Sequence, residues 1–427
     1  MPDDARAITE DLLAFIAASP SPFHAVDTAA GRLVEAGFVE ADLRDPLPGA
    51  GSKAFVRRGG TLVAWRTGEP GAPFRIVGAH TDSPNLRLKP NADHRSAGYR
   101  QLGVEVYGGA LLSSWLDRDL GLSGRVTVLE DGRPVERLFR IDRPILRIPQ
   151  LAIHLDRDVN ERGLVLNRQA HLAPIWGVGP DDGRGIRDLL ADAAGVDRQA
   201  IVAWDAMCHD LTPPTFAGVD DDLISAPRID NLLSCHAALR ALIDADPGAG
   251  VTPLVVLFDH EEVGSTTDRG AAGAFLAAVL ERISAATGAD RAGHLQALAA
   301  SHCVSADGAH ATHPNYPERH EPDHHVALNG GPVVKVNASA RYATDAASAA
   351  PFLTACAAVE VPVQWFVTRS DLACGSTIGP LTAAQLAVPT VDVGVAQLAM
   401  HSARETAGAL DPPRFVAALG AYLGRAA

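Results

Sequence analysis

The chain has 427 residues, of which 47% are hydrophobic and 21% charged, and this composition is typical of a globular protein with a large core. Lys and Arg number 37 against 51 Asp and Glu, giving a formal net charge of −14. Without a long Lys/Arg run, such a chain repels a phosphate backbone, so we expect no nucleic-acid partner. An anionic small substrate would require a local cation to offset this charge.

Membrane association and secretion are not expected. No apolar run approaches the roughly 18 to 20 residues that cross a bilayer. The acidic start MPDDARAITEDLLAF is unlike the basic start of a signal peptide. The cysteines are scattered and form no CxxC pair, which predicts reduced thiols in a cytoplasmic protein. They are Cys208, Cys235, Cys303, Cys356 and Cys374.

The first elements along the chain are two helices followed by two strands. Acidic and apolar residues alternate at helical spacing over residues 3–18. Ser21 and Pro22 supply an N-cap and a first helical residue for a second helix, which we expect to end near Ala36, before Gly37. TLVAW (61–65) and FRIVGA (74–79) are predicted strands.

The middle third differs from the segments on either side of it. Residues from about 90 to 225 contain many Pro and Gly and a predicted β-hairpin with its turn at Glu130-Asp131-Gly132. From residue 226, helices alternate with short apolar runs, which indicates an α/β sheet. The expected elements are an amphipathic helix (230–245), a buried strand (252–258), an Ala-rich helix (270–287) and strands at 301–306 and 390–393. We therefore predict one α/β domain (1–88 and 226–427) interrupted by a β-rich domain (89–225).

Acidic and imidazole side chains follow several predicted strands. His80 and Asp82 follow FRIVGA, and Glu261 and Glu262 follow VVLFDH. Ligand sites in open α/β sheets lie beyond the carboxyl ends of the strands, so segments distant in sequence meet there. The remaining members of this set are Asp230 after ISAPRI, Asp307 after SHCVSA, and His401 after the strand near residue 390.

Two imidazoles and several carboxylates without a thiolate suit Zn²⁺, and also Mn²⁺ or Co²⁺. A pair of ions about 3.5–4 Å apart requires one shared carboxylate, for which Asp230 is the candidate. His80 with Asp307 would hold one ion, and His401 with Glu262 the other. In this interpretation Asp82 orients the imidazole of His80, and Glu261 takes a proton from water. Taken singly, a Glu-Glu pair is most simply a solvated loop, and Asp230 most simply a helix N-cap.

Long blocks of the sequence resemble the aspartyl aminopeptidase family of metallopeptidases. The match runs from the first helix to the last. Its blocks are HTDSPNLRLKP (80–90), DNLLSCHAAL (230–239), FDHEEVGS (258–265), SADGAHATHPNYPERHEP (305–322), GPVVKVNASARYA (331–343), GSTIGP (375–380) and QLAMHSARE (397–405), with RIPQLAIHLDRDVNERG (147–163) in the inserted domain.

The resemblance implies a zinc-peptidase α/β domain with a mixed sheet and flanking helices, interrupted by a β-rich dimerisation domain. It implies two Zn²⁺ ions per subunit, dimers that assemble into a tetrahedral shell of twelve subunits, a cytoplasmic location and a peptide substrate with an acidic N-terminal residue. Carried over by motif, the metal ligands, the base and the orienting aspartate coincide with the residues named above.

Three further residues are implied by the resemblance alone. His154 in LAIHLDRD resembles a histidine that reaches the neighbouring subunit's active site and stabilises the oxyanion, although a metal-ligand role is an alternative. Lys335 and Tyr342 match positions near the substrate, and Lys335 would be the local cation. His260 stands where many relatives carry Asn, and Ser376 stands where Thr is common.

Other interpretations remain to be tested. A deacylase or amidase acting on N-acyl amino acids would use the same ligands, and an assembly protein without catalysis would keep the shell. The histidines between His310 and His325 would form a second metal site, or more simply a loop near the active site. No GxSxG elbow occurs and Cys374 has no evident His partner, which argues against a serine or cysteine hydrolase.

Overall fold

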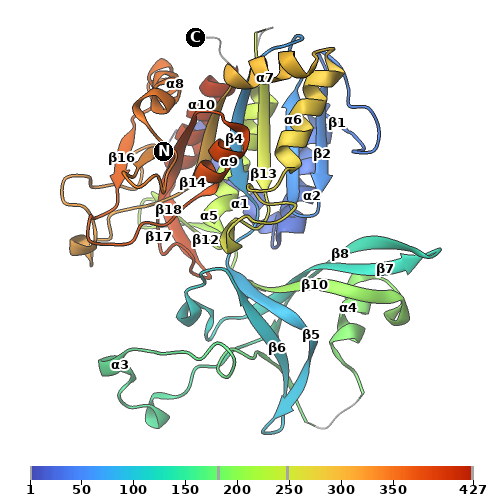
Figure 1. Ribbon diagram of the computed structural model, residues 1–427. Coiled ribbons are helices and arrows are strands. Elements are labelled where there is room, and N and C mark those ends of the chain that lie inside the picture. Colours follow the sequence, from blue (N-terminus) through green and yellow to red (C-terminus); the bar gives the residue numbers. More distant parts are fainter. Residues whose placement is uncertain (1, 180–182, 247–249, 425–427) are drawn as a thin grey trace. The chain divides into compact units, whose positions relative to one another are not determined.

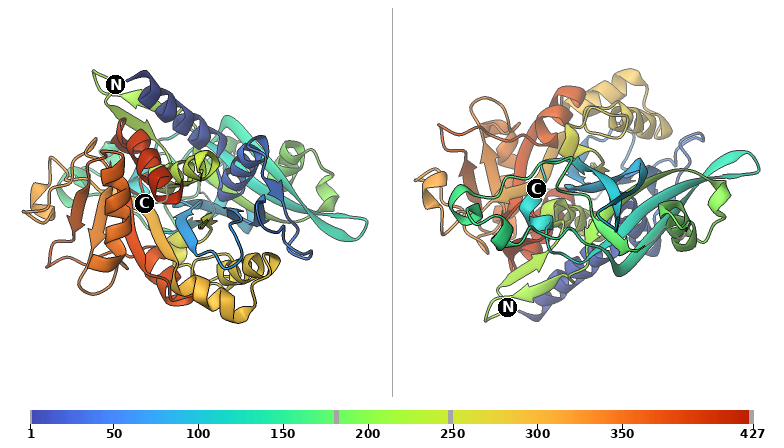
Figure 2. Two further views of the ribbon diagram at one scale, coloured as in Figure 1. Left: turned by 90° about the horizontal axis from the view of Figure 1, so that it is seen from above. Right: turned by 90° about the horizontal axis from the view of Figure 1, so that it is seen from below.

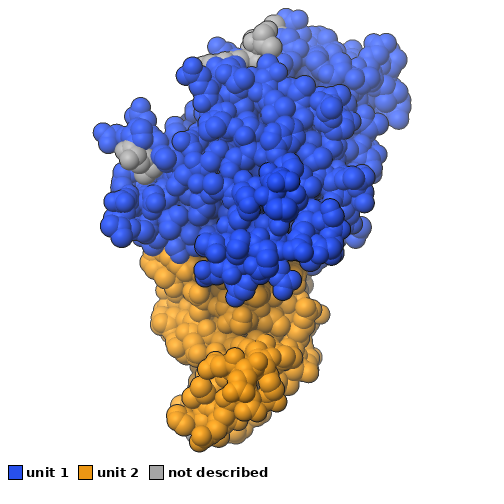
Figure 3. All heavy atoms as spheres, turned by 90° about the vertical axis from the view of Figure 1, so that its left-hand side faces the viewer, with its two compact units in different colours: residues 1–82, 214–400, 405–427 blue, residues 83–213, 401–404 orange. Residues whose placement is uncertain are grey.

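The computed structural model describes residues 2–179, 183–246 and 250–424, and the chain divides into two compact units (Figures 1 and 3). Unit 1 comprises Met1–Asp82, Pro214–Met400 and Glu405–Ala427, and unit 2 comprises Ser83–Pro213 and His401–Arg404. These boundaries differ from the sequence-based ones after residues 88 and 225. The reason is that the strand beginning at Asn85 pairs within unit 2, whereas the short strands after residue 214 pair within unit 1.

Unit 1 is built on a mixed sheet that contains twelve strands among the described residues. Four strands near its centre, β13, β4, β14 and β17, run parallel, so their carboxyl ends lie along one edge. The pairing order is β1 (Val39–Glu40), β2 (Lys53–Arg58), β3 (Thr61–Arg66), β13 (Thr252–Phe258), β4 (Phe74–His80), β14 (His302–His310), β17 (Thr390–Leu398), β18 (Glu405–Gly408), β12 (Leu223–Ala226) and β11 (Thr215–Ala217), with β15 (Val333–Val336) on β17 and β16 (Gln364–Val367) on β15.

Helices cover both faces of this sheet (Figure 2). The side chains of β13 show why its sequence is continuously apolar: Val255 and Leu257 enter one core, and Leu254 and Val256 enter the other. The first core is completed by α1 (Asp3–Ala18), α2 (Pro22–Glu35), α5 (Ile229–Asp244), α8 (Ala346–Ala358) and α10 (Asp411–Gly424), and the second by α6 (Phe275–Ala286), α7 (Arg291–Ala299) and α9 (Ile378–Leu386).

The first two helices confirm the sequence reading. Helix α2 begins at Pro22, and the side chain of Ser21 accepts a hydrogen bond from the backbone N–H of His24. The expectation that α5 is amphipathic was wrong. Its residues are buried on every side from Ile229 to Leu239, because the sheet lies on one side and α1 and α10 pack on the other.

Three element boundaries differ from the sequence prediction. Strand β14 continues to His310 and β17 to Leu398, because the two strands pair in parallel from Cys303 with Thr390 as far as His310 with Gln397. Polar residues in SADGAH hide this extension in the sequence. Asp307 therefore lies within β14 and does not follow it. The Ala-rich helix begins only at Phe275 because the preceding residues form turns, with Gly273 N–H bonded to Gly270 O.

Unit 2 contains a sheet of six strands within the described residues, and all its pairings are antiparallel. The predicted hairpin is present: Glu130 pairs with Arg133, and Asp131 and Gly132 form its two-residue turn with φ of 50° and 75°. The order is β8 (Arg133–Leu146), β7 (Leu120–Glu130), β10 (Ile201–Asp210), β5 (Asn85–Ser96), β6 (Tyr99–Tyr107) and β9 (Ile175–Val178).

Short helices complete both units. In unit 2 these are η1 (Leu112–Trp115), η2 (Ile153–Leu155), α3 (Val159–Arg162), α4 (Ile186–Ala194) and η3 (Arg198–Ala200), and α4 packs on β7 and β8. In unit 1 they are η4 (Glu261–Val263) and η5 (Pro317–Arg319). Among the described helices, none has the length and hydrophobicity needed to cross a bilayer.

Candidate metal centre

An imidazole and two carboxylates meet at the carboxyl edge of the parallel strands in unit 1. His80 is the last residue of β4, Asp230 lies at the start of α5, and Asp307 lies in the neighbouring strand β14. The Nε2 atom of His80 is 3.3 Å from an Oδ1 atom of each aspartate, and the three side chains are 1%, 4% and 11% exposed. The structure thus brings these three residues, which are distant in sequence, close together.

Two glutamates from η4 complete a second group around the same imidazole. Glu261 and Glu262 follow β13, which pairs in parallel with β4 so that Phe258 lies beside His80. One potential ligand atom from each of His80, Glu261 and Glu262 lies within 4.8 Å of the others. The same spacing holds for His80, Asp230 and Asp307. His80 therefore belongs to two overlapping groups of metal-type donors.

Asp82 joins the end of β4 to the η4 loop. Its fully buried carboxylate accepts hydrogen bonds from the backbone N–H groups of Glu261 and Glu262, each at 3.1 Å and one on each oxygen. The Nδ1 atom of His80 lies 3.0 Å from the backbone oxygen of Asp82 and 3.5 Å from its carboxylate. One residue thus sets the position of both an imidazole and the two glutamates.

The cluster places several carboxylates close together in a buried region. Burial, with the neighbouring carboxylates of Asp307 and Asp230, raises the pKa of Glu261 to about 8. Burial likewise raises the pKa of Glu262 well above its ordinary value. Burial opposes protonation of His80, but its hydrogen bonds to carboxylates raise its pKa well above the usual range. Cations are therefore strongly favoured here, which is the electrostatic character of a divalent metal site.

The donor set also fits zinc chemically. Zinc binds imidazole nitrogen and carboxylate oxygen at about 2.0–2.2 Å, so two ligands of one ion lie within roughly 4 Å of each other. The atoms of His80, Asp230 and Asp307 satisfy this requirement.

The two remaining histidines of the prediction belong to unit 2. His401 lies three residues beyond β17, and its Nδ1 atom is 3.1 Å from the backbone oxygen of Gly109. His154 lies in η2 with its side chain exposed. Their roles at the centre remain predictions.

Lys335 and Tyr342 lie close to Asp307. The ammonium of Lys335, on β15, is 3.0 Å from the backbone oxygen of Gly308 and 3.7 Å from a carboxylate oxygen of Asp307. It also lies 5.2 Å from the ring centre of Tyr342. Lys335 is only 2% exposed. Its positive charge is therefore directed at these protein groups, and its contact with an acidic substrate stays a prediction.

Several supporting residues were missed in the sequence. Glu405 accepts a hydrogen bond from the backbone N–H of Asp230 at 2.9 Å, and the thiol of Cys235 contacts the backbone oxygen of His80 at 2.9 Å. Asp392 is fully buried and receives hydrogen bonds from Ser305 and Thr377. Glu405 is the last residue of the QLAMHSARE block, and this position is the sequence feature that could have identified it. For Asp392, the corresponding feature is a carboxylate within the otherwise apolar run VDVGVA.

His260 and the later histidines do not add metal ligands in the described structure. The Nδ1 atom of His260 bonds to Thr267 at 2.9 Å, within its own loop. Between His310 and His325, the described residues contain no group of three close metal-type donors. The hydrogen bond of His260 agrees with the simpler interpretation of that residue.

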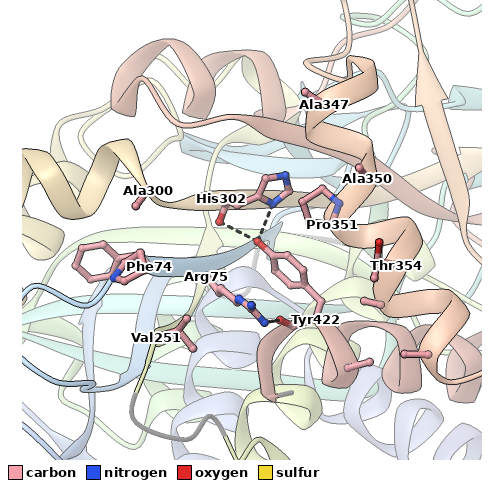
Figure 4. Close-up of a pocket in the computed structure, with 14 residues that line it drawn as sticks. Phe74, Arg75, Val251, Ala300, His302, Ala347, Ala350, Pro351, Thr354 and Tyr422 are labelled. Atoms are coloured by element: carbon pink, nitrogen blue, oxygen red, sulfur yellow. Dashed lines mark hydrogen bonds between the residues drawn. The ribbon is translucent and has the colours of Figure 1, made fainter. Parts of the chain in front are cut away.

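A separate cavity of about 760 Å³ lies at the opposite, amino ends of the parallel strands (Figure 4). It is lined by Phe74 and His302 at the starts of β4 and β14, and by small residues of α8. The hydroxyl of Tyr422 bonds to the backbone oxygen and Nδ1 of His302. No carboxylate lines this cavity among the described residues, so we do not assign catalysis to it.

A family model described as Aminopeptidase I zinc metalloprotease (M18) matches residues 15–422. The chain belongs to the M18 aminopeptidase family. Proteins described as "Probable M18 family aminopeptidase 2" are similar over nearly the full length. The one from Streptomyces coelicolor is 50% identical over 427 residues, covering 98% of both chains. The one from Mycobacterium leprae is 52% identical over 422 residues, covering 97% of this chain and 98% of that protein.

Solved structures agree with this assignment. A chain of the solved complex of Ape4 and Nbr1 superposes with a TM-score of 0.95 at 36% identity, covering 98% of this chain and 86% of that one. The structure of prApe1 gives a TM-score of 0.92 at 28% identity, covering 98% and 95%. The prediction of an α/β metallo-aminopeptidase with a mixed sheet and flanking helices is confirmed. This M18 member is a metallo-aminopeptidase, and its family is a zinc metalloprotease family.

Proposed function

We propose that this chain is a dinuclear zinc aminopeptidase that removes the N-terminal residue, preferentially an acidic one, from peptides. The observation that carries the proposal is the meeting of His80, Asp230 and Asp307 at 3.3 Å, beside Glu261 and Glu262. Two neighbouring carboxylates alone do not identify a metal site. A buried imidazole with several carboxylates around it, one of them placed to be shared, supplies the ligand types that a pair of divalent ions uses.

In this proposal Asp230 would be a ligand of both zinc ions. His80 and Asp307 would hold one ion, and Glu262 and His401 would hold the other. His401 is assigned from its place in the sequence, three residues after the end of β17, which is parallel to β14 and so ends at the carboxyl edge of the sheet. Mn²⁺ or Co²⁺ would suit the same donors.

When bound, the ions would polarise the scissile carbonyl and lower the pKa of the attacking water. Glu261 is the neighbouring carboxylate that is not needed as a ligand, so it accepts the proton of the water and delivers it to the leaving amine. Asp82 holds Glu261 in place through the backbone N–H bond at 3.1 Å. We assign stabilisation of the developing oxyanion to Tyr342 and to His154 of a neighbouring subunit.

The role of Glu261 is tested by Glu261→Gln. The amide keeps the size of the side chain but cannot accept a proton. We expect an unchanged metal content and a kcat about 10²- to 10⁴-fold lower. Glu281→Gln, on the exposed face of α6, is the control and keeps full activity. Full activity of a metal-loaded Glu261→Gln protein would rule out the proton-transfer role.

The reaction itself is tested with substrates that carry Asp, Glu or Leu at a free N-terminus, beside their N-acetyl counterparts. The aminopeptidase cleaves the free-amine substrates, loses activity with chelator and regains it with Zn²⁺. Cleavage of the blocked substrates alone would establish the N-acyl amino acid deacylase. Metal binding without turnover of either set would support an assembly protein.

We further propose that the chain forms a homododecamer in the cytoplasm, with unit 2 as the dimerisation domain. A similar chain, at 28% identity, was solved as the mApe1 dodecamer. Apolar side chains of the segment 151–165, which contains His154, are exposed in the isolated chain, including Leu151 (59%), Leu155 (74%) and Val165 (85%), as expected of a surface that packs on another subunit. All five cysteines, each in the described part, are free thiols, which fits a reducing compartment.

A further inference from the structure

A buried carboxylate that the proposed mechanism does not use lies in the sheet of unit 1. Asp392 is the third residue of β17, and its side chain is fully buried. One carboxylate oxygen accepts hydrogen bonds from the hydroxyls of Ser305, at 2.6 Å, and Thr377, at 2.5 Å. The other oxygen accepts the backbone N–H of Ala343 at 2.6 Å. Because a buried carboxylate without donors would be costly, these bonds are what stabilises Asp392 in the core.

Two of the three donors come from elements packed around the metal centre. Ser305 is on β14, two residues before the proposed ligand Asp307. Thr377 is the N-cap residue of α9, and its hydroxyl also accepts the backbone N–H of Gly379 at 3.2 Å. A Cβ atom at Gly379 would overlap both carboxylate oxygens of Asp392, so glycine allows the start of α9 to approach the carboxylate closely. The positive end of this helix therefore faces the negative charge.

The third donor belongs to the segment 341–344, which carries Tyr342. Residues 337–345, between β15 and α8, form neither helix nor strand, so no regular backbone ladder fixes this segment. Two hydrogen bonds to Asp392 hold it against β17. The backbone N–H of Ala343 donates to the carboxylate, and the backbone N–H of Asp392 donates to the hydroxyl of Thr344 at 2.9 Å. Asp392 thus fixes the two residues that directly follow Tyr342.

The surroundings of Tyr342 suit a hydrogen-bond donor at the reaction centre. Its ring lies 5.2 Å from the ammonium of Lys335, which is 3.7 Å from a carboxylate oxygen of Asp307. Burial, together with the neighbouring Cys374, raises the pKa of the phenol above its ordinary value. The hydroxyl therefore keeps its proton and can donate it in a hydrogen bond.

We propose that Asp392 is the positioning residue of Tyr342: its carboxylate anchors residues 341–344 to β17 and thereby holds the phenol where the oxyanion forms. The inference rests on the proposed aminopeptidase function and adds a residue that acts through Tyr342. A donor stabilises an oxyanion at about 2.7–3.1 Å, so a small displacement of the phenol removes its effect. Asp392 is enclosed by protein groups and does not itself contact the substrate.

Two substitutions separate the anchor from the charge. Asp392→Ala removes every bond of the carboxylate. In Asp392→Asn the amide oxygen keeps the bond to the N–H of Ala343. The amide NH₂ group then donates to the hydroxyls of Ser305 and Thr377, because hydroxyls accept as well as donate. Asp392→Asn should therefore keep kcat within about fivefold of the wild type, since the bond that fixes the segment is retained.

The removal of the anchor should appear in kcat. We expect Asp392→Ala to lower kcat by about 10- to 100-fold, with KM within about threefold of the wild type, because an oxyanion donor acts in the transition state. Zinc content should stay unchanged. Leu280→Ala, in the second core of unit 1 on α6, is the control for loss of stability. It should keep the wild-type kcat at temperatures where it is folded.

A double-mutant cycle distinguishes positioning from general damage. Tyr342→Phe removes the hydroxyl alone and should lower kcat by about 10²- to 10³-fold. In the Tyr342→Phe protein no donor remains to be positioned, so adding Asp392→Ala should lower kcat by less than about threefold. Full multiplication of the two effects would overturn the proposal. Wild-type kcat in Tyr342→Phe would overturn it as well.

Thiol labelling gives a second readout that does not depend on catalysis. Cys374, beside Tyr342, is partly exposed, whereas the other four cysteines are buried. A thiol reagent under native conditions therefore reports on Cys374. Displacement of Tyr342 in Asp392→Ala should speed this labelling by about tenfold, because thiol reactivity follows exposure. The stoichiometry should stay at one thiol per chain, since only unfolding exposes the others.

The two readouts keep the levels of the proposal apart. If the wild type cleaves no free-amine substrate, the proposed function fails and the oxyanion role of Tyr342 fails with it, while the labelling rate still decides whether Asp392 anchors Tyr342. If the wild type is active and Asp392→Ala leaves the labelling of Cys374 unchanged, the positioning role is overturned while the aminopeptidase stands.

Discussion

Asp82 controls the metal centre without being one of its proposed ligands, and Asp82→Asn tests this. Each carboxylate oxygen accepts one backbone N–H, from Glu261 and from Glu262, both at 3.1 Å. The amide replaces one of these oxygens by a donor, so one hydrogen bond to a charged acceptor is lost. Such a bond contributes about 1.5–3 kcal/mol, or about 10- to 150-fold in an equilibrium constant.

The two hydrogen bonds hold η4 beside the end of β4. We therefore expect the loss of one of them to weaken metal binding. The affinity for zinc, measured by competition with a chromophoric chelator, should fall by about 10- to 100-fold. At saturating zinc, kcat should still be reduced because Glu261 is less well placed. Asp27→Asn, at an exposed position of α2, serves as control. Wild-type zinc affinity and kcat in a folded Asp82→Asn protein would refute the reasoning.

Two further predictions concern stability. A Cβ atom at Gly394 would overlap the backbone oxygen of Asp307 on the adjacent strand, so Gly394→Ala should lower the free energy of unfolding by about 1–3 kcal/mol and weaken zinc binding. Gly420→Ala is the control, because a Cβ atom at Gly420 enters open space. Equal unfolding curves for the two variants would contradict this prediction. Burial raises the pKa of Asp411 to about 6 in the folded chain, compared with about 4 in the unfolded chain. Between these two pH values the folded state therefore binds more protons than the unfolded state. The free energy of unfolding falls by up to about 3 kcal/mol as the pH rises through this range. Denaturant unfolding of the wild type relative to Asp411→Asn at pH 4 and pH 7 should show this loss, and a difference independent of pH would contradict it.

Much of the local structure could be predicted because its causes are local. The N-cap at Ser21, the first helical residue Pro22 and the turn at Asp131 and Gly132 depend on a few neighbouring residues. The residues at which strands end were harder to predict from the sequence. The extension of β14 beyond residue 306 depends on pairing with β17, which is distant in sequence. Burial of α5 on all sides likewise depends on α1 and α10, which its own periodicity does not reveal.

The candidate ligands could be named from the sequence, but their supports could not. His80 and Glu262 follow apolar runs, and such positions meet at the carboxyl edge of a parallel sheet. The carboxylate of Asp82 was expected to orient His80. The structure shows in addition that this carboxylate accepts two hydrogen bonds from backbone N–H groups of η4. Because the donors are backbone groups, no pattern of side chains in η4 predicts these bonds. The burial of Lys335 was also unpredictable, because the sequence shows its charge but not the carbonyl of Gly308 that it contacts.

The sequence by itself determined several of the strands and helices and which acidic and imidazole residues stand at or near their ends, because these features follow from short-range hydrophobic periodicity and turn chemistry. Only the tertiary structure decided that β13 lies beside β4 and β4 beside β14, and therefore that His80 faces both Asp307 and the η4 glutamates. Strand order depends on pairing between residues far apart in the chain, and no local pattern records the partner.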